Sequence, residues 1–153
     1  ASVLNVLIDE GINLDLNAVD RNGLTALHVA CKAMNDDVAK ILIKNANSEN
    51  HSAENSSSST SCSMSKVDVN LQDKLGRTPL LYACLNSDFV LVKELLGVSG
   101  INVNLTDNDG LSPIRAACFN PDQKLINLIM SNNDLILSED DKEIVNKALE
   151  IKV

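Results

Sequence analysis

Aromatic residues are almost absent from this chain, whose 153 residues include no Trp, one Tyr and two Phe. A core without large rings has to be built from Leu, Ile, Val and Ala on short elements that approach one another closely. No apolar run reaches the ~18 residues of a membrane-spanning helix, and no signal-peptide pattern is present. We therefore expect one elongated domain with an intracellular location.

Basic residues are also scarce, because 13 Lys and Arg face 21 Asp and Glu and give a formal net charge of −8. Nonspecific binding to nucleic acid or to an anionic membrane requires clustered Lys and Arg. The sequence therefore argues against a nucleic-acid partner and against membrane insertion by this segment.

Motifs for catalysis are missing too: there is no phosphate-binding loop, no Gly-x-Ser-x-Gly and no His-Glu-x-x-His. His28 lies one helical turn from Cys31, but two ligands without a close partner make a poor metal site. We expect no enzymatic activity, no metal and no cofactor. Of the four cysteines, only Cys62 is expected to be freely reactive.

The chain does contain a sequence motif that occurs three times, Asn-x-x-Asp-x-x-Gly-x-(Ser/Thr)-x-(Leu/Ile). The copies begin at Asn17, Asn70 and Asn104. Gly76 and Gly110 are 34 residues apart, whereas Gly23 and Gly76 are 53 apart. The longer spacing fits one repeat of ~33 residues plus an insertion of about 20. The spacing predicts stacked modules that draw their stability from their neighbours.

Each copy predicts a tight turn followed by two short helices. The turn glycines are Gly23, Gly76 and Gly110, the predicted N-caps are Thr25, Thr78 and Ser112, and the turn carboxylates are Asp20, Asp73 and Asp107. Pro79 and Pro113 occupy the first helical position, where a missing N–H costs nothing. The segments 14–17, 67–70 and 101–104 alternate apolar and polar residues, which predicts extended arms of β-hairpins.

The segments 25–30, 78–83 and 112–117 resemble the Thr-Pro-Leu-His-x-Ala helix start of the ankyrin repeat. The chain departs from that pattern at two places. Leu81 and Arg115 replace the His, and the Gly between the two helices is replaced by Met34, Ser87 and Pro121. These changes weaken single loops and leave the period intact. The resemblance implies a mainly α fold, an ankyrin-repeat solenoid of stacked helix-turn-helix units with β-hairpin turns.

We expect five parts along the chain. They are a partial N-terminal repeat (1–19), three ankyrin repeats (20–72, 73–106 and 107–137) and a C-terminal capping helix (138–153). Because residues 1–10 read as the second helix of a unit, we expect a fragment of a longer protein with further repeats upstream. The Ser-rich insertion, 48–66, is predicted to be a loop that serves as a phosphorylated tether or is neutral low-complexity sequence.

Cys31, Cys84 and Cys118 recur at one position of the repeat. Equivalent residues of stacked helices lie ~8–10 Å apart. That spacing exceeds the ~7 Å between Cα atoms that a disulfide tolerates. We therefore predict that these three cysteines are small core residues.

The resemblance implies a noncatalytic protein–protein interaction module, a scaffold or adaptor segment of a larger protein that binds a protein partner through its concave face and hairpin tips. The alternative is an accessory or regulatory segment of an enzyme or membrane protein whose catalytic or membrane domain lies outside this sequence. Residues two and five after the buried Leu of each first helix are expected on the concave face. They are Val29, Lys32, Tyr82, Leu85, Ala116 and Phe119.

Two of the three aromatic residues fall at these positions, which suggests an apolar patch with a polar rim. The candidate partner-binding residues are Tyr82, Leu85, Phe119, Lys32, Arg21, Lys74, Arg77, Asn108 and Arg115. The alternative for Phe119 is that its ring packs between adjacent helices.

Overall fold

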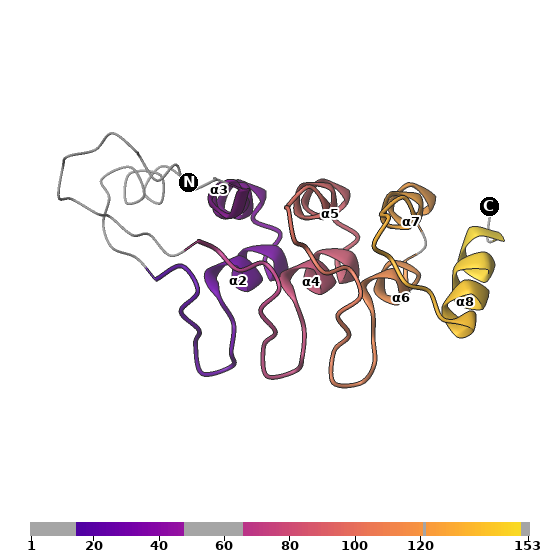
Figure 1. The fold of residues 1–153 in the computed structure, drawn as a ribbon, viewed down its shortest axis with the longest axis horizontal. Helices are drawn as coiled ribbons and strands as arrows, with labels where there is room; N and C mark the ends of the chain where they lie inside the picture. Colours follow the sequence, from indigo (N-terminus) through magenta and orange to yellow (C-terminus); the bar gives the residue numbers. More distant parts are fainter. Residues whose placement is uncertain (1–14, 48–65, 121, 151–153) are drawn as a thin grey trace.

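The computed structural model describes residues 15–47, 66–120 and 122–150, and these form helices joined by turns and hairpins. The helices are α2 (Ala26–Lys32), α3 (Asp36–Asn47), α4 (Pro79–Leu85), α5 (Phe89–Leu96), α6 (Pro113–Ala117), α7 (Gln123–Met130) and α8 (Glu139–Glu150). Figure 1 shows two rows, with α2, α4 and α6 in one and α3, α5 and α7 in the other. Three hairpins project from the first row, and α8 closes one end of the stack. The predicted mainly α solenoid is confirmed.

The helices of the first row begin where the sequence predicts. The side chains of Thr25, Thr78 and Ser112 each accept a hydrogen bond from the backbone N–H three residues later. Pro79 and Pro113 occupy the first turn of their helices. These contacts satisfy N–H groups that have no partner inside a helix, and they fix where each helix starts.

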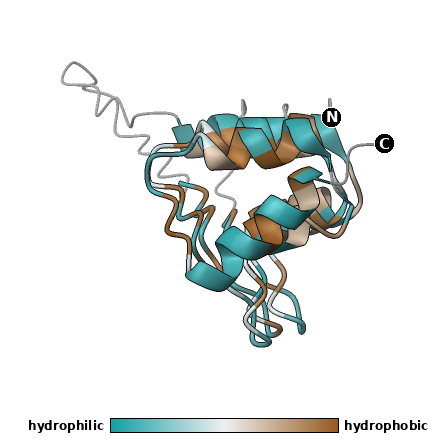
Figure 2. Cartoon of the chain, turned by 90° about the vertical axis from the view of Figure 1, so that its right-hand side faces the viewer, coloured by the Kyte–Doolittle hydropathy of each residue, from teal (hydrophilic) through white to brown (hydrophobic). Residues whose placement is uncertain are grey.

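The core lies between the two rows. In Figure 2 the apolar residues gather on the sides of the helices that face the other row. Leu27, Leu80 and Ile114 occupy equivalent buried positions. Cys31 and Cys84 are buried free thiols, as predicted. Burial raises the pKa of Cys31 to about 12 and raises that of Cys84 as well. Cys118 is only half-buried, and its pKa is raised less strongly by the same cause.

The hairpins are organised by a carboxylate and a glycine. Asp73 Oδ1 accepts backbone N–H groups from Leu75 at 2.8 Å and Arg77 at 2.9 Å, and the first and third hairpins repeat this arrangement. Gly23, Gly76 and Gly110 have φ values of 78°, 79° and 83°. The turn glycines and the turn carboxylates predicted from the sequence are both confirmed.

The segments predicted as extended hairpin arms are not strands within the described residues. They curl into turns, and an Asn side chain joins each one to the next. Asn70 Nδ2 donates to the carbonyl oxygen of Gly100 at 2.8 Å, and its Oδ1 accepts the N–H of Asn102 at 2.8 Å. Asn17 and Asn104 make equivalent pairs of bonds. The side-chain amide of each Asn thus supplies the hydrogen-bond donor and acceptor that backbone groups would supply in a β-sheet.

The turns between paired helices are strained at two positions. Met34 and Ser87 have φ values of 56° and 54°, in the left-handed region that favours Gly. The Ser87 hydroxyl is also buried, and it finds no hydrogen-bond partner in the described part of the chain. The departures from the family pattern at these two residues therefore carry a local cost, as predicted. Pro121 lies outside the described residues.

The last helix, α8, begins with reciprocal hydrogen bonds. Ser138 Oγ accepts the backbone N–H of Asp141 at 3.1 Å, while the Ser138 N–H donates to Asp141 Oδ2 at 3.0 Å. Its outer face carries exposed Lys142, Glu143, Lys147 and Glu150, and the helix contacts both α6 and α7. The predicted helix within residues 1–10 and the predicted loop at 48–65 lie outside the described residues.

Candidate partner-binding site

The three hairpins and the first row of helices build one continuous surface. We call this surface the inner face and define it as residues 20–24, 73–77, 107–111 and 118–119 with α2, α4 and α6. It corresponds to the concave face expected from the sequence. Its charged residues are Arg21, Lys32, Lys74, Arg77 and Arg115 on the basic side, and Asp20, Asp73, Asp107 and Asp109 on the acidic side. Of the carboxylates, Asp73 and Asp107 are buried.

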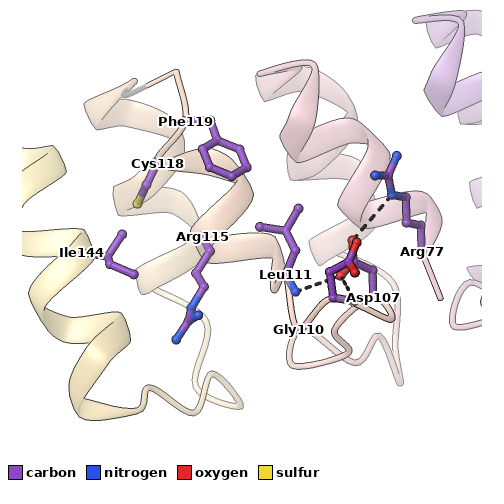
Figure 3. Close-up of a pocket in the computed structure, with 9 residues that line it drawn as sticks. Arg77, Asp107, Gly110, Leu111, Arg115, Cys118, Phe119 and Ile144 are labelled. Atoms are coloured by element: carbon purple, nitrogen blue, oxygen red, sulfur yellow. Dashed lines mark hydrogen bonds and ion pairs between the residues drawn. The ribbon is translucent and has the colours of Figure 1, made fainter. Parts of the chain in front are cut away.

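A groove of about 470 Å³ lies at one end of the inner face. Its apolar lining comes from Leu111, Cys118, Phe119 and Ile144. Arg77, Arg115 and Asp107 are among the charged residues that line it. Figure 3 shows Arg115 between Ile144 of α8 on one side and the Leu111 and Phe119 side chains on the other. The groove therefore combines an apolar floor with two guanidinium groups.

Phe119 is the exposed aromatic residue of this groove. It lies two residues beyond the end of α6, after the C-cap residue Cys118, and 65% of the residue is exposed to solvent. The alternative in which its ring packs between adjacent helices is therefore wrong. An exposed ring next to a groove lined by apolar residues is a candidate contact point for a partner.

Tyr82 lies elsewhere than the sequence pattern suggested. It is buried, with 6% exposed, and its hydroxyl donates to Asp73 Oδ2 at 2.6 Å. Its ring lies nearly perpendicular to that of His28, at an interplanar angle of 84°, and Arg77 Cζ lies 5.7 Å from the ring centroid. The carboxylate of the hairpin draws the ring inward, because a buried phenol needs a hydrogen-bond acceptor. An exposed patch of Tyr82, Leu85 and Phe119 does not form.

The hydrogen bond between Asp73 and Tyr82 holds each of the two side chains in one protonation state. Burial alone would raise the pKa of Asp73, but hydrogen bonds from Tyr82 and from the backbone outweigh burial and lower it. Burial and the nearby carboxylate both raise the pKa of Tyr82. Asp73 is therefore an ionised carboxylate that accepts a hydrogen bond from the neutral phenol of Tyr82. This bond fixes the position of the Tyr82 ring, which Arg77 faces.

Both arginines of the groove face a carboxylate through Nε, and the buried Nε of Arg77 makes no hydrogen bond within the described residues. Arg77 Nε lies 3.6 Å from Asp107 Oδ2, and Arg115 Nε donates to Asp141 Oδ1 of α8. Burial would raise the pKa of Asp141, but hydrogen bonds from Arg115 and Ser138 lower it. The hydrogen bond from Arg115 also raises the pKa of that guanidinium. Each arginine is thus oriented before any partner arrives.

The remaining candidate residues lie along the inner face away from the groove floor. Arg21, Lys74 and Asn108 are exposed at the hairpin tips, and Lys32 is exposed at the end of α2. Leu85 is half-buried and packs against the core. The backbone N–H of Asn108 and its side-chain amide bond to the carbonyl groups of the second hairpin, so neighbouring tips are tied together.

Sequence reasoning missed Leu111, Cys118 and Ile144 as groove residues. Leu111 and Cys118 read as ordinary apolar positions of a repeat, and Ile144 reads as part of the buried side of a capping helix. No local signal shows that α8 packs beside α6 and brings Ile144 to the groove. The contact between Arg115 and Asp141 is equally invisible, because 26 residues separate the two side chains.

His28, considered from the sequence as a metal ligand together with Cys31, is a structural residue. Its Nδ1 accepts the backbone N–H of Thr25 at 3.1 Å, and its Nε2 lies 2.9 Å from the Arg77 carbonyl oxygen. Both ring nitrogens are therefore engaged. Within the described ranges, no group of three or more His, Cys, Asp or Glu is placed to hold a metal ion. In the same ranges no helix has the length and apolar character to cross a membrane.

Comparison with known proteins agrees with this anatomy. A model of three ankyrin repeats matches residues 50–140, and a model of many ankyrin repeats matches residues 7–61. The chain belongs to the ankyrin repeat family. Ankyrin repeats are generally protein–protein interaction modules and are typically noncatalytic.

The chain is also similar in sequence to a known protein. The chain is 35% identical over 96 residues to neurogenic locus notch homolog protein 1 of Danio rerio. The aligned region covers 63% of this chain and 3% of that protein. The chain thus corresponds to a small part of its relative's length.

Proposed function

We propose that this chain is a noncatalytic scaffold or adaptor segment of a larger protein and that it binds a protein partner on the inner face. The observation that carries this proposal is Phe119, which is 65% exposed beside a groove whose walls hold Arg77 and Arg115. Aromatic and Arg side chains at the centre of an interface, surrounded by a polar rim, concentrate binding energy.

The inner face is rigid before binding, which favours this use. The Lys74 N–H donates to Asn22 O at 3.0 Å, and the Asn108 N–H donates to Leu75 O at 2.9 Å, so each hairpin is tied to the next. A surface that is already ordered loses little conformational freedom when a partner docks. Ordering the hairpins therefore costs little of the binding free energy.

Different residues have different roles in this proposal. Phe119 is the anchor, and Arg77 and Arg115 flank it. Arg21, Lys74, Asn108 and Lys32 extend the contact along the tips and the end of α2. Tyr82 does not touch the partner in this account. It supports Arg77, whose guanidinium carbon lies 5.7 Å from its ring centroid.

Affinity capture with the intact chain tests the proposal when two matched variants are included. Phe119→Ala removes the exposed ring of the inner face. Phe89→Ala removes the other Phe, which is 37% exposed at the start of α5 in the second row. Proteins retained by the wild type and by Phe89→Ala, and lost with Phe119→Ala, are the expected result. An identical set of proteins on all three baits contradicts the proposal.

A further inference from the structure

The inner face differs in charge from the rest of the molecule. In the whole chain acidic residues outnumber basic ones by 21 to 13. The inner face carries five cationic residues and four carboxylates, and two of the carboxylates, Asp73 and Asp107, are buried. The charge that this face offers to an approaching partner is therefore more positive than that of the remaining surface.

Two of the carboxylates around the groove are already engaged, and a third, Asp109, is exposed. Asp107 Oδ1 accepts the backbone N–H groups of Asp109 and Leu111, each at 2.9 Å, and its Oδ2 faces Arg77 Nε. Asp141 accepts from Arg115 and from Ser138. A basic group that bound Asp107 or Asp141 would have to displace these donors, which would leave a half-buried guanidinium without its anion.

The arginines, in contrast, have capacity left. Asp141 occupies the Nε edge of Arg115, and the two Nη groups of Arg115 donate no hydrogen bond to the described residues. A guanidinium presents five N–H donors in a planar fork, so a second carboxylate can bind at the unused edge. Its side chain is 34% exposed, which leaves that edge within reach of a ligand.

We propose that the groove takes a short segment of the partner in which a bulky apolar side chain lies next to an Asp or Glu. The apolar side chain packs against Phe119 and Leu111, and the carboxylate accepts hydrogen bonds from Arg115. A volume of about 470 Å³ falls within the ~300–1,000 Å³ range of ligand-binding pockets and suits such a side chain. This inference rests on the proposed function and adds the chemistry of the partner.

Selection from a random peptide library tests the chemistry without assuming a sequence. The full chain is immobilised, and 12-residue peptides displayed on phage are enriched over successive rounds. We expect the enriched peptides to share a Phe, Leu, Ile or Trp within three positions of an Asp or Glu. Basic or uncharged consensus sequences, or no enrichment at all, would overturn the inference.

Binding of one enriched peptide then tests the residues. Fluorescence anisotropy is expected to show at least a tenfold loss of affinity when the acidic residue of the peptide becomes Lys, and a similar loss with Arg115→Gln. Because Arg115→Gln also removes a contact to α8, Arg77→Gln provides a second variant that leaves Asp141 untouched. Lys93→Gln on α5 is the matched control and should bind as the wild type does.

The outcomes separate this inference from the proposed function. If Arg115→Gln binds the peptide as the wild type does, Arg115 does not bind the peptide carboxylate and the inference fails, whatever Arg77→Gln shows. Capture of whole proteins that depends on Phe119 can still succeed in that case. If capture is independent of Phe119, the proposed function itself fails.

Discussion

The imidazole of His28 in α2 and the backbone carbonyl of Arg77 in the second hairpin are joined across two repeats by a hydrogen bond of 2.9 Å. Nδ1 of the same ring accepts the Thr25 N–H, so in the neutral tautomer Nε2 carries the hydrogen and donates it. One buried side chain thus caps its own helix and positions the hairpin that carries an arginine of the groove.

This contact predicts a pH dependence of stability. Burial lowers the pKa of His28 below its ordinary value of 6.5, although the bond to Arg77 opposes the shift. A folded-state pKa below the unfolded one means that the stabilisation is complete above about pH 6.5 and is lost as pH falls toward the folded pKa. Urea unfolding between about pH 7.5 and pH 5 should show this loss.

The control for that experiment is His28→Gln, which should be less stable than the wild type at neutral pH and nearly flat over the same range. The carboxylates titrate separately, because the pKa of Asp73 is lowered from 3.8 and its stabilisation is lost only below that value. Equal pH dependence in the wild type and in His28→Gln would show that this ring does not carry the effect.

The turn glycines predict a graded response to Ala. Gly76 and Gly110 both have positive φ, which costs an L-residue about 1–2 kcal/mol. A Cβ on Gly76 would lie 2.6 Å from Asn108 Oδ1 and 2.7 Å from Asn108 N, whereas a Cβ on Gly110 meets nothing within 4 Å. Gly76→Ala should therefore lose more than Gly110→Ala in chemical denaturation.

Lys74→Ala serves as the surface control for these glycines, with an expected change within about 0.5 kcal/mol. The hydrogen bonds that join Lys74 to the first and third hairpins use its backbone N–H and carbonyl groups. Equal losses at Gly76 and Gly110 would mean that the contact between the second and third hairpins relaxes freely.

The strained helix-to-helix turns predict stabilising substitutions. Met34→Gly and Ser87→Gly should each raise the free energy of unfolding by about 1 kcal/mol, because Gly relieves the left-handed strain and loses part of that gain through its more flexible unfolded chain. Ser87→Gly should gain more, since it also removes a buried hydroxyl without a partner in the described residues. Thermal unfolding of the two variants checks the order.

The two aromatic residues near the groove should behave oppositely in stability measurements. Tyr82→Phe removes the hydrogen bond to Asp73 and should cost about 1–2 kcal/mol, since the acceptor is a charged group. Phe119→Ala should change stability by less than about 0.5 kcal/mol, because the ring is exposed. Comparable destabilisation by both substitutions would place Phe119 in the core.

Much of the fold could be predicted from local chemistry. Gly76, Thr78 and Pro79 specify a turn, a cap and a helix start within four residues, and the structure follows them. The extended arms were wrongly predicted because alternating apolar and polar residues do not reveal that Asn70 bridges to Gly100 and Asn102 through its side chain. Such contacts depend on how the repeats stack.

The candidate site was only partly predictable, for the same reason. The exposure of Phe119 follows from where α6 ends, and the burial of Tyr82 follows from the carboxylate of Asp73 beneath it. The sequence contains both side chains but does not show their directions. The part of the groove that α8 supplies, Ile144, becomes visible only when the capping helix is docked on α6.

The proposed function depends above all on Phe119, through which a partner is expected to bind the inner face. The most direct test is the dissociation constant of a captured partner for the wild type, Phe119→Ala and Phe89→Ala, measured by titration calorimetry with unfolding midpoints recorded in parallel. We expect Phe119→Ala to lose at least about 2 kcal/mol of binding free energy with an unchanged midpoint, and Phe89→Ala to lose none. Equal affinities for Phe119→Ala and the wild type would contradict the proposed function.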